Sequence, residues 1–236
     1  MDIEQLSVFF PAYNEEANLE KTVTNAIGIL EKVARQWEIL IINDGSKDKT
    51  AEIAERLTLS DKRIRVITHS PNRGYGAAFK SGLYNARFPW IAFTDTDGQF
   101  DFSEITNFFK KQKETEADLV IGYYLKREVP LIRIWGSKVW QLLVFLTFGL
   151  RVRDIDCGFK LIKKEVVDKI PPLEAERGPF ISSEFLIKAK AFGFKIVEIG
   201  VHHYPRLAGE ATGANWKVVV SGFKDLIKLR KKLAKI

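Results

Sequence analysis

Two carboxylates separated by one residue, Asp95 and Asp97, are the strongest chemical signal in this sequence. They directly follow residues 90–94, an apolar run typical of a buried strand. Like charges this close are costly to hold at the end of such a strand unless a cation binds them. A divalent ion that also binds diphosphate oxygens would meet that need, and Mg²⁺ and Mn²⁺ prefer hard oxygen ligands of this kind. A solvated loop is the competing interpretation.

Two further polar clusters follow apolar runs nearer the amino terminus. Asp44, in the sequence Asn-Asp-Gly-Ser, could accept hydrogen bonds from the edge of a nucleobase, although such residues also favour an ordinary turn and helix cap. Tyr13 and Glu15 could flank the same base or its ribose, or simply begin a helix. Each cluster taken alone leaves both interpretations open.

The elements that must position these residues alternate along the first half of the chain. Short apolar runs predict buried strands at 6–10, 38–42, 64–67, 90–94 and 118–121. Between them, helical spacing predicts helices at 15–35 (after an Asn14 cap), 48–58 and 75–87, and a capping box at 101–104 opens a fourth. This order predicts an α/β fold with a mostly parallel sheet and right-handed crossovers. Ligands bind beyond the carboxyl ends of the strands in such a sheet, which is where the polar clusters lie.

The second half of the chain has a different pattern. Residues 131–150 form an apolar, aromatic helix candidate, and a shorter mixed α/β stretch covers 156–201. No linker rich in proline, glycine or serine marks a second domain. We therefore expect one catalytic domain over residues 1–215, which includes the 131–150 helix, followed by a basic amphipathic helix at 216–236.

The positive charge is concentrated at the carboxyl end. The 236 residues carry a formal net charge of +7, and residues 216–236 contain seven lysines and arginines against one aspartate. The rest of the chain is nearly neutral, which argues against a basic groove for nucleic acid. A non-enzymatic adaptor that uses only this tail would leave the acidic cluster without a purpose.

Several features bear on the compartment. The single cysteine, Cys157, excludes an internal disulfide, and the first residues lack the layout of a signal peptide, so we expect an intracellular protein. The longest apolar run, 142–150, is shorter than the roughly 20 residues that a transmembrane helix needs. Trp135 and Trp140, with basic residues and no acid around them, suit a helix at a membrane interface. Packing of both amphipathic helices against the core is the alternative.

A dinucleotide-dependent oxidoreductase is the main rival among enzymes. Gly74-Tyr75-Gly76 follows a predicted strand and opens a predicted helix, and Asp95 lies 21 residues beyond Gly74. The third glycine of that fingerprint is absent, because Phe79 stands in its place. The fingerprint also leaves Asp44 and Asp97 unexplained.

Taken in order, these motifs resemble family 2 glycosyltransferases with a GT-A fold, and among them the dolichyl- and polyprenyl-phosphate mannosyl- and glucosyltransferases. The resemblance covers about the first 210 residues and is carried by residues 11–16, 43–46, 73–77, 95–99, 153–160, Glu184 and Arg206.

The resemblance implies roles for individual residues. Nucleotide-binding residues are implied at Pro11, Ala12, Tyr13, Glu15, Asp44, Gly74, Asp95 and Thr96. A Mn²⁺ or Mg²⁺ ion is implied at Asp95, Asp97 and Gln99, and a part in catalysis at Asp95, Asp97, Glu184 and Arg206. Acceptor-phosphate residues are implied at Arg127, Arg133 and Ser137, of which the last two are four apart and so share one helix face.

The reaction implied is inverting transfer of a hexose from a nucleotide sugar to a polyprenyl or dolichyl phosphate. We expect mannose from GDP-mannose, with glucose from UDP-glucose as the alternative. The setting implied is the cytoplasmic face of a membrane, where a peripheral protein meets an anionic surface and a membrane-anchored partner protein. Three positions depart from the family pattern: Asn43 replaces an acid, Phe100 and its successors replace a His-Pro pair, and Tyr123 and Tyr124 stand where an arginine is usual.

Overall fold

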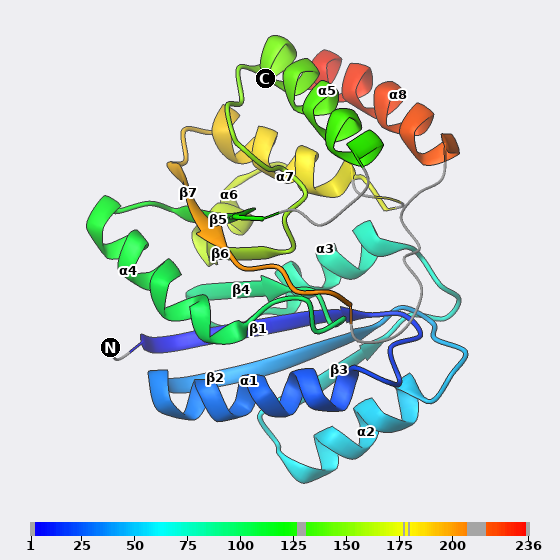
Figure 1. Cartoon of the computed structure of the whole chain (residues 1–236), viewed down its shortest axis with the longest axis vertical. Coiled ribbons are helices and arrows are strands. Elements are labelled where there is room, and N and C mark those ends of the chain that lie inside the picture. The colour runs from blue at the N-terminus through cyan, green and yellow to red at the C-terminus, as the bar shows by residue number, and fades with distance from the viewer. Residues whose placement is uncertain (1–2, 127–130, 177, 179, 207–215, 235–236) are drawn as a thin grey trace.

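A single seven-stranded sheet forms the centre of the molecule, with the strand order β3-β2-β1-β4-β6-β5-β7 (Figure 1). The computed structural model describes residues 3–126, 131–176, 178, 180–206 and 216–234, with backbone alone at 131–133 and 216–221. The strands are β1 (Ile3–Ala12), β2 (Ala34–Asn43), β3 (Ile64–Thr68), β4 (Trp90–Thr94), β5 (Leu119–Tyr124), β6 (Phe159–Lys163) and β7 (Ile196–Val201).

The sheet is mostly parallel, as the alternation of strands and helices predicts. Strands β3, β2, β1 and β4 pair in parallel, and so do β5 and β7. Strand β6 lies antiparallel between β4 and β5. The sequence placed β6 only within a mixed stretch, because an apolar run indicates a strand but not its direction.

Helices cover both faces of the sheet (Figure 1). They are α1 (Leu19–Val33), α2 (Thr50–Ser60), α3 (Tyr75–Asn85), α4 (Ile105–Thr115, after the 3-10 turn Phe102–Glu104), α5 (Leu131–Phe148), α6 (Lys164–Lys169), α7 (Phe180–Ala191) and α8 (Trp216–Leu233). Helices α1, α2 and α4 pack on one face, and α3, α6 and α7 on the other. Helices α5 and α8 lie side by side beyond α7, and Leu226 and Leu229 of α8 are buried in the same core.

The two cores follow from the alternation of side chains along the strands. On β1, Phe9 faces α3, where its ring centre lies 5.6 Å from that of Phe79. Its neighbours Val8 and Phe10 face the opposite core. Gly82 allows the close approach of α3 to β1, because a Cβ there would lie 2.2 Å from the Phe9 ring.

Helix α1 begins later than the sequence predicts. Asn14 does not cap it: its backbone is left-handed, with φ of 56°, and its Oδ1 accepts a hydrogen bond from Lys47 N at 2.8 Å. The backbone N–H of Glu15 donates to Thr50 Oγ1 at 2.8 Å, so the first residue of α2 satisfies a group that a first helical turn would leave unpaired. The capping box at 101–104 is half formed: Asp101 accepts from Ser103 N at 2.9 Å, whereas Glu104 binds His202.

Candidate active site

Asp95 and Asp97 lie immediately beyond the end of β4, where Asp97 is buried and Asp95 is half-buried. Burial and the neighbouring charge of Asp97 raise the pKa of Asp95 to about 7, whereas Lys160 and Arg206 oppose that rise. The raised pKa expresses the cost of confining two carboxylates at the end of a buried strand. A bound cation would remove that cost, so the structure agrees with the chemistry proposed for this pair.

The wall of this acidic site is built by β6. Its antiparallel register places Phe159 beside Thr94, so Gly158 comes next to Asp95. A Cβ on Gly158 would lie 2.0 Å from Asp95 Oδ2, and only glycine leaves room for the carboxylate. Lys160 follows on the same strand, wholly buried, and burial lowers its pKa. Its ammonium group donates to the Cys157 carbonyl and lies close enough to Asp95 to offset its charge.

Arg206 joins two of the predicted acidic residues. Its Nη2 lies 3.0 Å from Asp97 Oδ2 and 3.6 Å from Glu15 Oε1. Burial raises the pKa of Glu15, against the hydrogen bond from Asn18 and the charge of Arg206. Two hydrogen bonds of 2.9 Å between Gln99 and Tyr204 hold the segment that leads to Arg206 beside the aspartates.

The ends of the first, second and fourth strands are tied together by short contacts. Thr96 Oγ1 donates to the Pro11 carbonyl at 2.5 Å, and Asp44 N donates to the Ala12 carbonyl at 2.9 Å. Thr22 Oγ1 of α1 donates to the Thr96 carbonyl at 2.9 Å. These bonds place the segments predicted to hold a nucleotide along one edge of the sheet.

The Asp44 carboxylate anchors the loop that precedes α3. It accepts hydrogen bonds from Arg73 N at 3.0 Å and from Gly74 N at 2.8 Å, and His69 Nδ1 lies 2.6 Å from it. The structure therefore brings Asp44 and Gly74 together, while Tyr13 nearby is 36% exposed. His69 was not predicted from the sequence, although it follows β3 at the sheet edge where the other polar clusters lie.

The glycines at the start of α3 serve packing within the protein. A Cβ on Gly76 would lie 2.8 Å from the carbonyl oxygens of Ala175 and Glu176, and the N–H groups of Arg73 and Gly74 are bound by Asp44. In a dinucleotide site these positions face the pyrophosphate instead. The geometry thus argues against the oxidoreductase interpretation.

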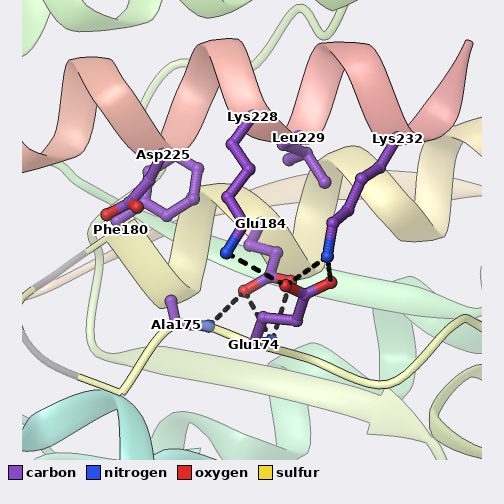
Figure 2. Close-up of a pocket in the computed structure, with 8 residues that line it drawn as sticks. All are labelled: Glu174, Ala175, Phe180, Glu184, Asp225, Lys228, Leu229 and Lys232. Atoms are coloured by element: carbon purple, nitrogen blue, oxygen red, sulfur yellow. Dashed lines mark hydrogen bonds and ion pairs between the residues drawn. The ribbon is translucent and has the colours of Figure 1, made fainter.

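The Glu184 carboxylate binds a different set of groups from those around Asp97. Glu184 is buried in α7, and its carboxylate accepts hydrogen bonds from Glu174 N at 2.9 Å, Ala175 N at 2.8 Å and Lys188 Nζ at 2.6 Å. Figure 2 shows it beside Glu174, which binds Lys228 and Lys232 of α8. Its predicted part in catalysis stays a prediction.

The predicted acceptor-phosphate residues are only partly described. Ser137 is half-buried on α5, and Arg133 lies one turn before it, although the position of the Arg133 side chain is outside the described residues. Arg127 is wholly outside them. The contact of these residues with a phosphate stays a prediction.

The donor set at the acidic site fits a divalent ion that shares its ligands with a substrate. In the part of the chain that the structure describes, no group of three or more His, Cys, Asp or Glu side chains could hold a metal ion on its own. Asp95 and Asp97 provide hard oxygen atoms, and the absence of a side chain at Gly158 leaves room for the Asp95 carboxylate. Mg²⁺ and Mn²⁺ commonly bind in this way, with one or two carboxylates and the phosphate oxygens of a substrate.

Comparison with known proteins agrees with this geometry. The family model described as glycosyl transferase family 2 matches residues 7–171. The dolichyl-phosphate beta-glucosyltransferase of Saccharomyces cerevisiae is 30% identical over 256 residues, which cover 95% of this chain and 74% of the yeast protein. An undecaprenyl-phosphate 4-deoxy-4-formamido-L-arabinose transferase of Salmonella paratyphi A is also 30% identical, over 89% of this chain and 62% of its own.

Solved structures extend the likeness to the fold. The glucosyl-3-phosphoglycerate synthase of Mycobacterium tuberculosis, solved with Mn²⁺, UDP and phosphoglyceric acid, has a TM-score of 0.70 at 18% identity. The alignment covers 99% of this chain and 79% of that one. The expected GT-A architecture is confirmed, and the chain belongs to glycosyl transferase family 2.

Proposed function

We propose that this protein transfers glucose from UDP-glucose to a polyprenyl or dolichyl phosphate, with inversion at the anomeric carbon. The observation that carries the proposal is the Asp95 and Asp97 pair beyond β4, with Arg206 beside Asp97, in a chain 30% identical to dolichyl-phosphate beta-glucosyltransferases. From the sequence alone we expect mannose as the sugar. The names of these relatives favour the alternative sugar, glucose, and we therefore propose UDP-glucose as the donor.

The acceptor needs little activation in this reaction. The second pKa of a phosphate monoester is about 6, so its oxygen is largely anionic at neutral pH and can attack the anomeric carbon without a strong general base. The bond from that carbon to the UDP oxygen breaks as the new bond forms, and UDP leaves. Positioning of the two substrates and stabilisation of the leaving diphosphate then supply most of the rate enhancement.

We assign the leaving-group side of the reaction to the acidic site. Asp95, Asp97 and Gln99 would hold Mn²⁺ or Mg²⁺ together with diphosphate oxygens, and a bound ion neutralises the charge of the departing diphosphate. Arg206 lies between Asp97 and Glu15, where its guanidinium can bind another diphosphate oxygen. Asp44, Tyr13 and Glu15 lie along the same edge and would hold the nucleoside.

We further propose that the protein works on a membrane surface through an apolar face, here called the α5/α8 surface. It consists of two stripes on neighbouring helices: Trp135, Val139, Leu142 and Leu146 on α5, and Phe223 and Ile227 on α8. Leu146 is 70% exposed and Ile227 is 59% exposed.

Helix packing and charge support this placement. The ring centres of Trp140 and Phe223 lie 5.6 Å apart, so the two helices are in contact. Exposed lysines, Lys138, Lys224 and Lys231, flank the apolar stripes. Exposed apolar stripes flanked by basic groups suit anionic lipid better than water. Within the described residues, none of the helices combines the length and hydropathy needed to cross a bilayer.

Calorimetric titration tests the donor half of the proposal. The protein is titrated with UDP-glucose, GDP-mannose and NADH, each with and without Mn²⁺. We expect binding of UDP-glucose that requires Mn²⁺ and is at least tenfold tighter than binding of GDP-mannose. Preference for GDP-mannose would restore the mannose interpretation, and metal-independent binding of NADH alone would contradict the transferase assignment.

A further inference from the structure

A row of three hydrogen-bonded side chains connects the end of β2 to α3. Asp44 follows β2, His69 follows β3, and Ser81 lies within α3. His69 Nδ1 is 2.6 Å from Asp44 Oδ1, and His69 Nε2 is 2.8 Å from Ser81 Oγ. Asp44 and His69 are buried, and Ser81 is half-buried. The proposed reaction leaves His69 and Ser81 without a role.

The chemistry of the three groups fixes the proton on the imidazole. An ionised carboxylate only accepts hydrogen bonds, so His69 Nδ1 donates to Asp44. Nε2 of the neutral ring then accepts from the Ser81 hydroxyl, which holds the ring in this tautomer. The same residue types perform nucleophilic catalysis in hydrolases. Here Ser81 lies inside a helix, where the backbone N–H groups bond within the helix and cannot form an oxyanion hole. The row therefore serves Asp44 and not a nucleophile.

The loop between β3 and α3 is also bound to the turn after β2. His69 N donates to the Asn43 carbonyl at 2.9 Å, and Asn72 Nδ2 donates to the Asp44 carbonyl at 2.7 Å. Gly45, with φ of 68°, permits this close approach, because a Cβ there would lie 2.7 Å from Asn72 N. The loop and the turn thus pack as one unit, which restricts the Asp44 carboxylate to one orientation.

The protein itself uses most of the acceptor sites of the Asp44 carboxylate. Oδ1 accepts from His69 Nδ1 and from Arg73 N at 3.0 Å, and Oδ2 accepts from Gly74 N at 2.8 Å. An ionised carboxylate has about four acceptor sites, two on each oxygen. Within the described residues, these bonds leave one site, on Oδ2. Only 4% of the side chain is exposed, so a ligand meets one edge of the carboxylate. Asp44 can thus accept one further N–H group.

Nucleobases differ in how many N–H groups they present side by side. The pairing edge of uracil carries a single donor, N3–H, between two carbonyl groups. The pairing edge of guanine carries two adjacent donors, N1–H and the N2 amino group, which match the two oxygens of a carboxylate. With His69 in place, Asp44 suits the single donor of uracil. Without the His69 bond, one site would be free on each oxygen, which is the arrangement that guanine requires.

We propose that His69, held by Ser81, sets the nucleobase preference of the donor site by occupying Asp44 Oδ1. The inference rests on the proposed function, in which Asp44 holds the nucleoside, and it names the residue that selects uridine. Guanine is disfavoured because its second donor would lose a hydrogen bond or would have to displace His69. His69 acts through Asp44 and is therefore a positioning residue.

Calorimetric titration with UDP and with GDP, each in the presence of Mn²⁺, tests this role through the ratio of the two Kd values. We expect wild type to bind UDP more tightly than GDP by about tenfold or more. His69→Phe keeps a ring without a donor and should lower that preference about fivefold or more. His69→Asn should restore most of the preference, because its amide N–H can donate to Asp44 from the position of Nδ1. Ser81→Ala leaves the imidazole in place and should lower the preference about two- to threefold, since the ring loses its partner.

Ser7→Ala is the matched control. Ser7 Oγ donates to the buried Glu38 carboxylate at 2.8 Å, where β1 and β2 pair away from their carboxyl ends. This variant should lower the free energy of unfolding and leave the preference for UDP unchanged. Equal weakening of UDP and GDP in His69→Phe, an unchanged preference in that variant, or tighter binding of GDP by wild type would overturn the role of His69. The expected pattern of binding in a protein that transfers no glucose would contradict the proposed function and leave the role of His69 standing.

Discussion

The Glu184 carboxylate lies 2.6 Å from the Lys188 ammonium one helical turn along α7, and both side chains are only 3% exposed. The same carboxylate binds the backbone N–H groups of Glu174 and Ala175. The Glu174 carboxylate in turn forms an ion pair with Lys232 of α8, whose Nζ lies 2.6 Å from Glu174 Oε1 (Figure 2). Glu184 therefore joins α7, the loop before it and α8, and that loop packs against Gly76 at the start of α3.

Replacement of Glu184 should destabilise the fold strongly. Glu184→Ala leaves the Lys188 charge buried without its carboxylate partner, which costs about 3–5 kcal/mol in free energy of unfolding. The matched control is Glu165→Ala, since Glu165 and Lys169 form an exposed pair with the same spacing and a 2.5 Å separation. Urea unfolding should show a far smaller change for the control. Equal changes would contradict the structural role of Glu184.

Gly158→Ala should remove activity from a folded protein. The new methyl group would lie 2.0 Å from Asp95 Oδ2 and would displace that carboxylate from the acidic site. Gly28→Ala is the control, because nothing lies within 4 Å of its Cβ and alanine stabilises a helix interior by roughly 1 kcal/mol. We expect at least a hundredfold loss of kcat for Gly158→Ala and full activity for Gly28→Ala. Full activity in both variants would contradict the role given to Gly158.

Cys157 should be unreactive in the folded protein. Burial raises the pKa of its thiol to about 12, so the nucleophilic thiolate is nearly absent at pH 8. A colorimetric thiol reagent should react only after unfolding. The unfolded chain loses this proton near pH 9 and the folded chain retains it, so this group lowers stability as the pH rises from about 9 to 12. Rapid labelling of the native protein at pH 8 would show that the thiol is accessible.

Charge placed on the α5/α8 surface should weaken membrane binding. The double variant Leu142→Glu and Leu146→Glu puts two carboxylates on its exposed apolar stripe. Leu59→Glu provides the control, since Leu59 is 88% exposed on α2, a helix outside this surface. Sedimentation with vesicles containing anionic lipid should show binding by wild type and Leu59→Glu and a loss of tenfold or more for the double variant. Equal loss in the control would mean that net charge alone decides binding.

The sequence predicted the sheet edge because strands and helices alternate regularly in the first half of the chain. The rule that ligands bind beyond the carboxyl ends of parallel strands placed Asp44, Asp95 and Asp97 correctly relative to the strands. It could not place β6, whose short apolar run says nothing of its direction or its neighbours. Consequently the buried Lys160 beside Asp95 was missed as a member of the site.

Other features depend on contacts between segments far apart in the sequence. The local sequence suggests that Asn14 caps a helix. Hydrogen bonds with Lys47 and Thr50 hold residues 14 and 15 outside the helix instead, so α1 begins only at Leu19. An arginine is absent at Tyr123 and Tyr124, yet Arg153 from a distant loop stacks on Tyr123. Only the folded chain shows that this guanidinium reaches the end of β5.

Formation of the glycolipid tests the central claim most directly. The protein is incubated with Mn²⁺, dolichyl phosphate and either labelled UDP-glucose or labelled GDP-mannose, and the organic phase is analysed by mass spectrometry. Our account predicts dolichyl phosphate glucose from UDP-glucose, at least tenfold less product from GDP-mannose, and none from Asp97→Asn. Lipid-linked mannose as the main product, or undiminished product from Asp97→Asn, would contradict it.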